Sequence, residues 1–225
     1  MTDAEHPRLA DLRVHYDLDV LMETAIAADP LSQFRSWFAQ AHDAGIVEPN
    51  AMVVATAGAD GVPHARTVLL KEADARGFAF YTNLTSEKSR DLQANPWATA
   101  VFGWYPQHRQ VIVTGRVESV PRDEAADYFA SRPRGSQLGA WASRQSSVVS
   151  GRAEFEDRYA EVEQRFADGE VEFPDFWGGW LIRPVMVEFW QGRESRLHDR
   201  LRFVSQGDSA PLDDPQGWTI QRLSP

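Results

Sequence analysis

The residues best suited to chemistry follow Trp190, close to the carboxyl end of the 225-residue chain. Three basic side chains occupy alternate positions there: Arg196, His198 and Arg200. Alternate residues of an extended chain share a face, so this spacing predicts that all three point the same way, beside the indole. Two guanidiniums and an imidazole near an aromatic ring suit a flat ligand that carries a phosphate. A solvated edge strand whose charges discourage aggregation explains the pattern equally well.

Three other segments carry cations in places that suit a phosphate. The stretch from Arg66 to Lys71 is apolar inside and basic at both ends. Strand alternation puts these two cations on opposite faces, so they share a ligand only across a bulge or strand end. Ser86-Glu87-Lys88 and Arg132-Pro133-Arg134 both lie at predicted helix starts, where backbone N–H groups and the helix dipole favour an anion. Each segment alone is usually a solvated charge, but together they indicate an anion site.

The sequence offers little for other kinds of catalysis. It contains no cysteine, which excludes disulfides, thiolate metal ligands and a cysteine nucleophile. Its six histidines, at positions 6, 15, 42, 64, 108 and 198, lack metal-ligand spacing, so we expect no metal site. The glycine-rich nucleotide motifs and the serine elbow are absent as well. We therefore expect an aromatic phosphate ligand, with redox or group-transfer chemistry supplied by a bound cofactor.

Composition and charge narrow the class of partner. The chain is 43% hydrophobic and 11% aromatic, which is enough for a sizeable core. Its formal charge of −10 argues against nucleic acid or an anionic membrane surface as the main partner. The amino terminus is polar and acidic, and no apolar run approaches the roughly 20 residues of a membrane span. We expect a cytoplasmic protein that binds small molecules.

Short strands with short connections dominate the predicted secondary structure. Alternating and continuous apolar runs predict strands at 51–57, 62–71, 77–82, 97–105, 110–120, 179–183, 185–191, 200–205 and 218–223. Residues 58–61 form the turn of a hairpin between the first two. Successive strands without alternating helices predict an antiparallel barrel or sandwich and argue against a doubly wound sheet. The fold class is therefore mostly β (α+β), with flanking helices.

Helices are expected where apolar residues recur at helical spacing between capping residues. Asp29 and Pro30 begin the first, with an apolar stripe that starts at Leu31, and Gly45 ends it. Further helices are predicted after Ser86, over 121–131, over 137–142 with Ser136 as its cap, and over 155–166. No composition break marks a linker. We expect an N-terminal arm or lid over residues 1–28 and one domain over 29–225.

Several stretches resemble the pyridoxamine 5′-phosphate oxidase family. They are Arg66–Lys71, Phe80–Asn83, Ser131–Arg134 with Gln137–Trp141, Gln145–Ser147, Phe176–Gly179, and Glu188–Gly192 running on to Arg196–Arg200. The resemblance covers nearly the whole chain from Arg13 onward. It implies an FMN-binding split barrel, and a homodimer with FMN at the subunit interface. Its implied activity is oxidation of pyridoxamine or pyridoxine 5′-phosphate to pyridoxal 5′-phosphate in vitamin B6 metabolism, with O₂ as acceptor and hydrogen peroxide as by-product.

The resemblance also implies roles for individual residues. FMN would be held by Arg66, Thr67, Val68, Leu69, Leu70, Lys71, Tyr81, Thr82, Lys88, Gln110, Gln145, Ser146, Trp190 and Arg200. The substrate phosphate would contact Lys71, Tyr128, Arg132 and Ser136; Arg196, Leu197 and His198 would lie over its ring, and Arg13 with Tyr16 would form a lid. Arg196 and His198 would be the catalytic residues. The family often has arginine where this chain has Glu87, a carboxylate that suits the helix dipole but repels a phosphate.

Two other functions are compatible with a flavin-binding fold of this kind. One is a different split-barrel flavin or deazaflavin reductase, and the other is a non-catalytic protein that stores or delivers flavin or pyridoxal phosphate. Arg132-Pro133-Arg134 and Arg196-Leu197-His198 favour the oxidase, because they resemble its substrate side.

Overall fold

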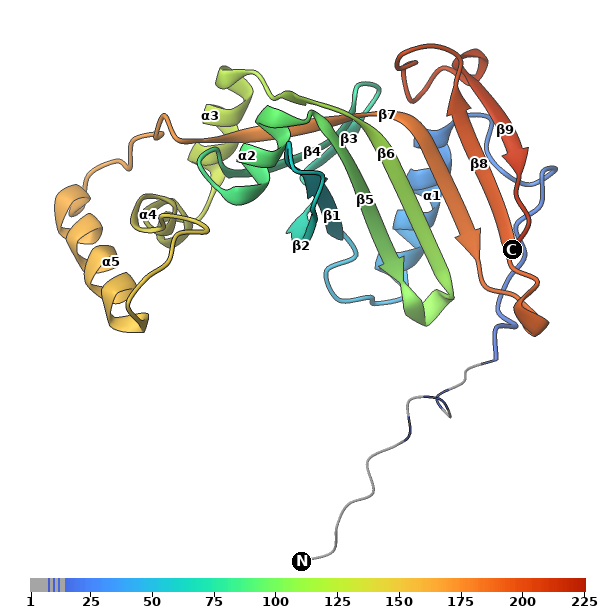
Figure 1. The fold of residues 1–225 in the computed structure, drawn as a ribbon, viewed down its shortest axis with the longest axis horizontal. Helices are drawn as coiled ribbons and strands as arrows, with labels where there is room; N and C mark the ends of the chain where they lie inside the picture. The colour runs from blue at the N-terminus through green and yellow to red at the C-terminus, as the bar shows by residue number, and fades with distance from the viewer. Residues whose placement is uncertain (1–7, 9, 11, 13–14) are drawn as a thin grey trace, which may run out of the picture.

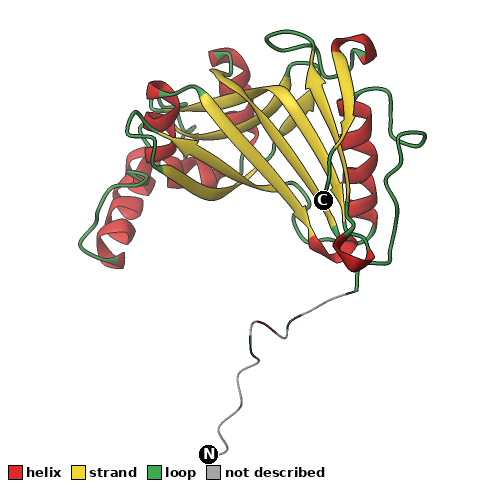
Figure 2. Cartoon of the chain, turned by 45° about the vertical axis from the view of Figure 1, so that its right-hand side comes forward, coloured by secondary structure: helices red, strands yellow, loops and turns green. Residues whose placement is uncertain are grey.

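The computed structural model describes residues 8, 10, 12 and 15–225. Its strands form one curled antiparallel sheet, with helices around it (Figures 1 and 2). The strands are β1 Ala51–Ala57, β2 Pro63–Leu69, β3 Glu72–Asp74, β4 Gly77–Asn83, β5 Trp97–Trp104, β6 Arg109–Ser119, β7 Trp177–Gln191, β8 Asp199–Ser205 and β9 Trp218–Arg222. Their order is β2-β1-β5-β6-β7-β4-β3, and β8 pairs with both β7 and β9. The predicted antiparallel architecture is confirmed, although the short β3 was not expected.

Strand β7 is central to the sheet, because β6 pairs with one of its edges and β4 and β8 pair with successive parts of the other. It pairs with β6 from Trp180 to Gln191, with β4 through Trp177–Ile182, and with β8 through Met186–Gln191. The prediction of two strands separated at Pro184 is wrong. The register of β6 against β7 shifts between Thr114 and Gly115, opposite this proline. A bulge there accommodates a residue that lacks an N–H, so one strand continues through it.

Helix α1, Pro30–Asp43, covers one face of the sheet (Figure 2). The Asp29 side chain accepts the Ser32 N–H at 2.7 Å and caps the helix, as predicted. Leu31, Phe34, Trp37 and Ala41 are buried against the strands, and form the main core with them. The helix ends at Asp43 with Ala44 as its C-cap, and Gly45 has φ +72°, the left-handed conformation expected after a helix end.

The other helices are α2 Glu87–Ala94, α3 Arg122–Ser131, α4 Arg134–Ala142 and α5 Arg152–Phe166. Helices α3, α4 and α5 share a second core with the start of β7, which includes Phe129, Leu138 and Trp177. The prediction that Ser136 caps a helix starting at residue 137 is wrong. Pro133 occupies the capping position with φ −52°, and α4 therefore begins three residues earlier than expected. Among the described residues, no helix has the length and apolar character needed to cross a membrane.

Candidate active site

A cleft of about 850 Å³ lies beside β2, α2 and α4 and collects most of the predicted site. The predicted FMN contacts that line it are Arg66, Thr67, Val68, Leu69, Lys71, Tyr81, Thr82, Lys88, Gln145 and Ser146. The predicted substrate contacts Tyr128, Arg132 and Ser136 line the same cleft. Leu70 does not, because its side chain is buried in the main core. Strand β2 ends at Leu69, and Lys71 lies beyond it, so both cations of this segment reach the cleft across a strand end.

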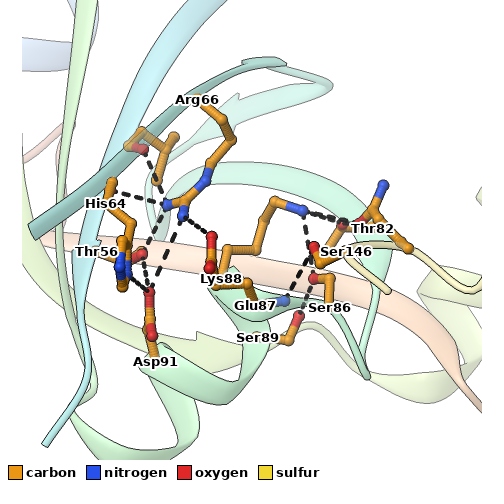
Figure 3. Close-up of polar contacts among 12 residues, drawn as sticks. Thr56, His64, Arg66, Thr82, Ser86, Glu87, Lys88, Ser89, Asp91 and Ser146 are labelled. Atoms are coloured by element: carbon orange, nitrogen blue, oxygen red, sulfur yellow. Dashed lines mark hydrogen bonds and ion pairs between the residues drawn. The ribbon is translucent and has the colours of Figure 1, made fainter. Parts of the chain in front are cut away.

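Lys88 supplies a buried cation at the start of α2 (Figure 3). Its Nζ donates to Gln145 Oε1 at 2.8 Å, Thr82 Oγ1 at 3.1 Å and Ser86 Oγ at 3.3 Å. All three acceptors are uncharged. Burial, together with the nearby Arg66 guanidinium, lowers the pKa of Lys88 to about 8. An anion in the cleft would therefore meet an ammonium group that has no carboxylate bound to it.

Arg66 is fixed by the backbone and side chains of the β1–β2 hairpin (Figure 3). Its Nη1 donates to Thr56 Oγ1 at 2.6 Å, the His64 carbonyl at 3.0 Å and the Val54 carbonyl at 3.3 Å. Its Nη2 faces Glu87 Oε2 at 3.4 Å. One edge of the guanidinium is thus used to hold it in place, and the other is turned toward the first turn of α2.

Asp91 lies behind this arginine and was not predicted to belong to the site. Its Oδ2 accepts from Thr56 Oγ1 at 2.7 Å and lies 3.1 Å from His64 Nδ1. Burial disfavours its charge, yet the hydrogen bonds from Thr56 and His64 hold its pKa below the usual value. Asp91 follows Lys88 by three residues, so a helix places both on one face; this spacing was the signal in the sequence that could have assigned Asp91 to the site.

A second cation, Arg132, lies against a stack of aromatic rings. The Tyr81 and Tyr128 rings are 4.1 Å apart and nearly parallel, and Trp177 stacks on Tyr81 at 5.7 Å. The Arg132 guanidinium carbon lies 4.7 Å from the centre of the Trp177 ring. Its Nη1 is buried without a hydrogen-bond partner among the described residues. Burial lowers the pKa of Arg132, and a buried donor without a partner is costly unless a ligand accepts from it.

Three other predicted FMN contacts form a row on the sheet, outside the cleft. Gln110 on β6 is the register partner of Trp190 on β7, which is in turn the partner of Arg200 on β8. Directly opposed residues on neighbouring strands share a face. The Arg200 Nε donates to the buried Glu188 carboxylate at 2.7 Å. These side chains are therefore neighbours, as one binding surface requires.

The turn between β7 and β8 carries the predicted catalytic residues, but in a different conformation from the one expected. Glu194–Arg196 form a short 3₁₀ turn in which Ser195 and Arg196 have φ +55° and +62°. The prediction that strand alternation aligns Arg196 with His198 is wrong, because the chain is not extended there. The His198 ring nevertheless lies 4.7 Å from the Trp190 ring, as expected for a shared site.

Tyr16, predicted to form part of a lid, packs against the His198 and Trp190 rings beside this turn. Its ring centre is 5.7 Å from that of His198 and 6.1 Å from that of Trp190. Arg13, its predicted companion, lies outside the described residues. Helices α2 and α4, which line the cleft, lie on the opposite side of the molecule from the turn between β7 and β8 (Figure 1). Within one chain, the predicted site residues therefore lie in two separate regions, the cleft and the neighbourhood of the turn between β7 and β8.

Comparisons with known proteins identify the family of this chain. Sequence models of two families match the chain: pyridoxamine 5′-phosphate oxidase over residues 38–166, and pyridoxine 5′-phosphate oxidase C-terminal dimerisation region over residues 177–225. The pyridoxine/pyridoxamine 5′-phosphate oxidase of Streptomyces avermitilis is 54% identical over 221 residues, which cover 96% of both chains.

Solved structures match the fold as well. PhzG from Burkholderia lata, in complex with tetrahydrophenazine-1-carboxylic acid, has a TM-score of 0.83 at 27% identity, covering 92% of this chain and 99% of its own. A pyridoxamine 5′-phosphate oxidase-related, FMN binding protein from Nostoc punctiforme has a TM-score of 0.64 at 17% identity, covering 85% and 97%. The curled sheet with its flanking helices is therefore a split barrel, as predicted. Within that class, the chain belongs to the pyridoxine/pyridoxamine 5′-phosphate oxidase family.

Proposed function

We propose that this chain is an FMN-dependent oxidase that converts pyridoxine or pyridoxamine 5′-phosphate to pyridoxal 5′-phosphate, with O₂ as acceptor. The observation that carries the proposal is a single cleft with two separate groups of cations. Arg66 and Lys88 form one group, and Lys71 and Arg132 form the other. Two phosphate-bearing molecules, a cofactor and a substrate, account for both groups in a protein whose net charge is −10.

FMN fits the first group by the chemistry of its donors. The cleft volume of about 850 Å³ lies within the usual range for small-molecule sites. Lys88 and Arg66 would hold the phosphate, with the Ser146 hydroxyl beside them at the start of α2. When bound, FMN supplies the acceptor for the hydride that leaves the substrate, and O₂ reoxidises it. The protein contributes charge and orientation.

The second group fits the phosphate of the substrate. Arg132 presents a buried Nη1 without a partner among the described residues, and Lys71 lies 5.9 Å from the centre of the Tyr128 ring. Tyr128 and Ser136 add hydroxyl groups to the same wall of the cleft. A phosphate placed here would give the Arg132 donor the acceptor that it lacks.

We infer that a second copy of the chain completes each site. Residues 177–225 match a family region described as a dimerisation region, which supports a homodimer. The turn between β7 and β8 would then reach the partner's cleft, bringing Trp190 and Arg200 to FMN, and Arg196, Leu197 and His198 to the substrate. Leu197 is 70% exposed in the single chain, which suits an apolar contact with a partner subunit.

His198 has a defined role in this arrangement. Burial and the nearby Arg196 charge lower its pKa, which favours a neutral ring near pH 7. Its Nδ1 accepts the Arg193 N–H at 3.1 Å, so the proton of the neutral ring belongs on Nε2. His198 would present that N–H to the substrate as a donor. Tyr16, packed on its ring, supports the proposal that residues 1–28 form an arm over the site.

The test is direct. The purified protein is examined for the absorption spectrum of a bound flavin, and pyridoxine 5′-phosphate is then added in air. The expected result is pyridoxal 5′-phosphate together with hydrogen peroxide. A flavin-bound protein that forms neither product would instead point to another split-barrel reductase or a flavin carrier. A colourless protein that cannot take up FMN would overturn every flavin-dependent function.

A further inference from the structure

The guanidinium of Arg66 is anchored on one edge without any help from Glu87. Three acceptors lie around Nη1, and the closest is Thr56 Oγ1 at 2.6 Å. Thr56 is 3% exposed and donates in turn to Asp91, which is 7% exposed. This buried chain of hydrogen bonds fixes the direction in which the other edge points. Removing the Glu87 side chain would therefore leave Arg66 in place.

Glu87 is exposed, in contrast to the buried Thr56 and Asp91. Its side chain is 49% exposed and lies 3.4 Å from Arg66 Nη2, the edge of the guanidinium that faces the cleft. Asp91 is farther from this nitrogen, at 4.0 Å. Glu87 lines the same cleft as Lys88 and Ser146 (Figure 3). The backbone N–H of Glu87 donates to Ser146 Oγ at 3.2 Å, so its main chain is held in place, whereas its carboxylate is half exposed and contacts only Arg66 among the described residues.

We propose that the Glu87 carboxylate competes with the phosphate of FMN for the cleft-facing edge of Arg66 and thereby weakens the grip on the cofactor. The proposal rests on the proposed use of FMN. A carboxylate and a phosphate are both acceptors for a guanidinium edge, and one such edge serves one of them at a time. FMN binding then requires Glu87 to give up Arg66, and its negative charge stays close to the phosphate dianion that replaces it.

This competition lowers the affinity for the phosphate of FMN and does not affect binding of the flavin ring. Riboflavin has the same ring system without a phosphate, so it does not need the Arg66 edge. Substituting Glu87 should therefore change the affinity for FMN and leave the affinity for riboflavin unchanged. A general disturbance of the cleft would alter both affinities together. The two ligands separate a local electrostatic effect from a loss of structure.

The experiment measures dissociation constants for FMN and riboflavin by flavin fluorescence, using apoprotein of the wild type, Glu87→Gln and Glu87→Lys. We expect Glu87→Gln to bind FMN about threefold to tenfold more tightly, and Glu87→Lys more tightly still. The matched control is Glu118→Gln. Glu118 is 50% exposed, pairs with Arg183 at 3.2 Å and does not line the cleft. This control should leave both dissociation constants unchanged.

The possible failures can be told apart. If the wild type binds FMN and Glu87→Gln binds it with equal or lower affinity, the competition does not exist and the proposed function survives. If riboflavin gains as much affinity as FMN, Glu87 acts on the cleft as a whole and the proposal is likewise overturned. A wild-type protein that binds neither flavin would remove the proposed function, and this inference with it.

Discussion

The cleft and the turn between β7 and β8 are both rich in cations, but the protein treats those cations differently. In the cleft, Lys88 donates only to uncharged oxygens, and Arg132 keeps a buried donor without a partner among the described residues. Near the turn, Arg193 and Arg200 each pair with a carboxylate at 3.1 Å and 2.7 Å. Cations without a carboxylate partner are available to anionic ligands, whereas paired cations hold the strands and the turn in place.

This difference suggests that the cleft supplies affinity for phosphates and the turn supplies orientation over the reacting ring. Glu87 is the exception in the cleft, because it faces Arg66 there. The comparison predicts that substitutions in the two regions will change different measured quantities. It also predicts that the two regions cooperate across a subunit interface.

The strongest test separates the two regions onto different chains. Arg132→Ala removes the proposed phosphate ligand from the cleft, and Arg196→Ala removes the proposed substrate contact from the turn. Each change should lower kcat/KM for pyridoxine 5′-phosphate by about 10-fold to 100-fold or more, the effect of losing a charged hydrogen bond. Mixed dimers of the two variants, isolated with two affinity tags, contain one intact site in two. Their activity should recover to about half that of the wild type.

The matched controls are the two variants purified separately, which should keep their lowered kcat/KM at the same concentration. Recovery depends on the cleft of one copy working with the turn of the other. If the mixed dimer is no more active than the single variants, each site is formed within one chain. The division into two regions would then lose its functional meaning.

Lys88→Met tests the cleft alone. The change removes a buried ammonium that has no carboxylate partner, so FMN should bind about 10-fold to 100-fold more weakly, as measured by flavin fluorescence. Arg183→Met is the matched control, because Arg183 pairs with Glu118 outside the cleft. It should change the dissociation constant by less than about twofold. Equal losses in the two variants would show that net charge, and not this site, governs FMN binding.

The same lysine predicts a pH dependence. Burial and Arg66 lower the pKa of Lys88 to about 8, while Glu87 acts in the opposite direction. Lys88 therefore loses its charge as pH rises through about 8 in the protein without FMN, and a bound phosphate raises that pKa. The dissociation constant for FMN should rise above pH 8, by up to about tenfold per pH unit. In Lys88→Met this rise should vanish; if it persists, another group is responsible.

Much of this comparison could be anticipated from the sequence, because its parts depend on local signals. The Asp29 cap and the antiparallel architecture were confirmed, and Lys88 in the first turn of α2 and Arg132 just before α4 line one cleft. Predictions from neighbouring residues alone were wrong where contacts with distant segments determine the backbone conformation. Pro184 continues a strand because β6 opposite it changes register. Arg196 does not follow strand alternation, since the turn puts it in the left-handed region.

The grouping of the site could not be predicted from spacing. Gln110 and Arg200 flank Trp190 only through the pairing of β6, β7 and β8, which joins residues far apart in the sequence. The anchoring of Arg66 through Thr56 to Asp91 is likewise a tertiary contact between a hairpin and a helix. Types of residue indicated a phosphate site, whereas the separation into two regions required the fold.

The smallest expected effect tests the paired region. Glu188 is buried between Arg200 and Arg202, which donate to its two oxygens at 2.7 Å and 2.9 Å. Glu188→Gln removes the charge shared by two partly exposed arginines, so the free energy of unfolding should fall by about 1–2 kcal/mol in urea denaturation. The affinity of the cleft for inorganic phosphate should stay unchanged, because Glu188 does not line it. If stability is retained while phosphate binding changes, the carboxylates near the turn do not serve to hold the fold. The contrast with the cleft would then have to be abandoned.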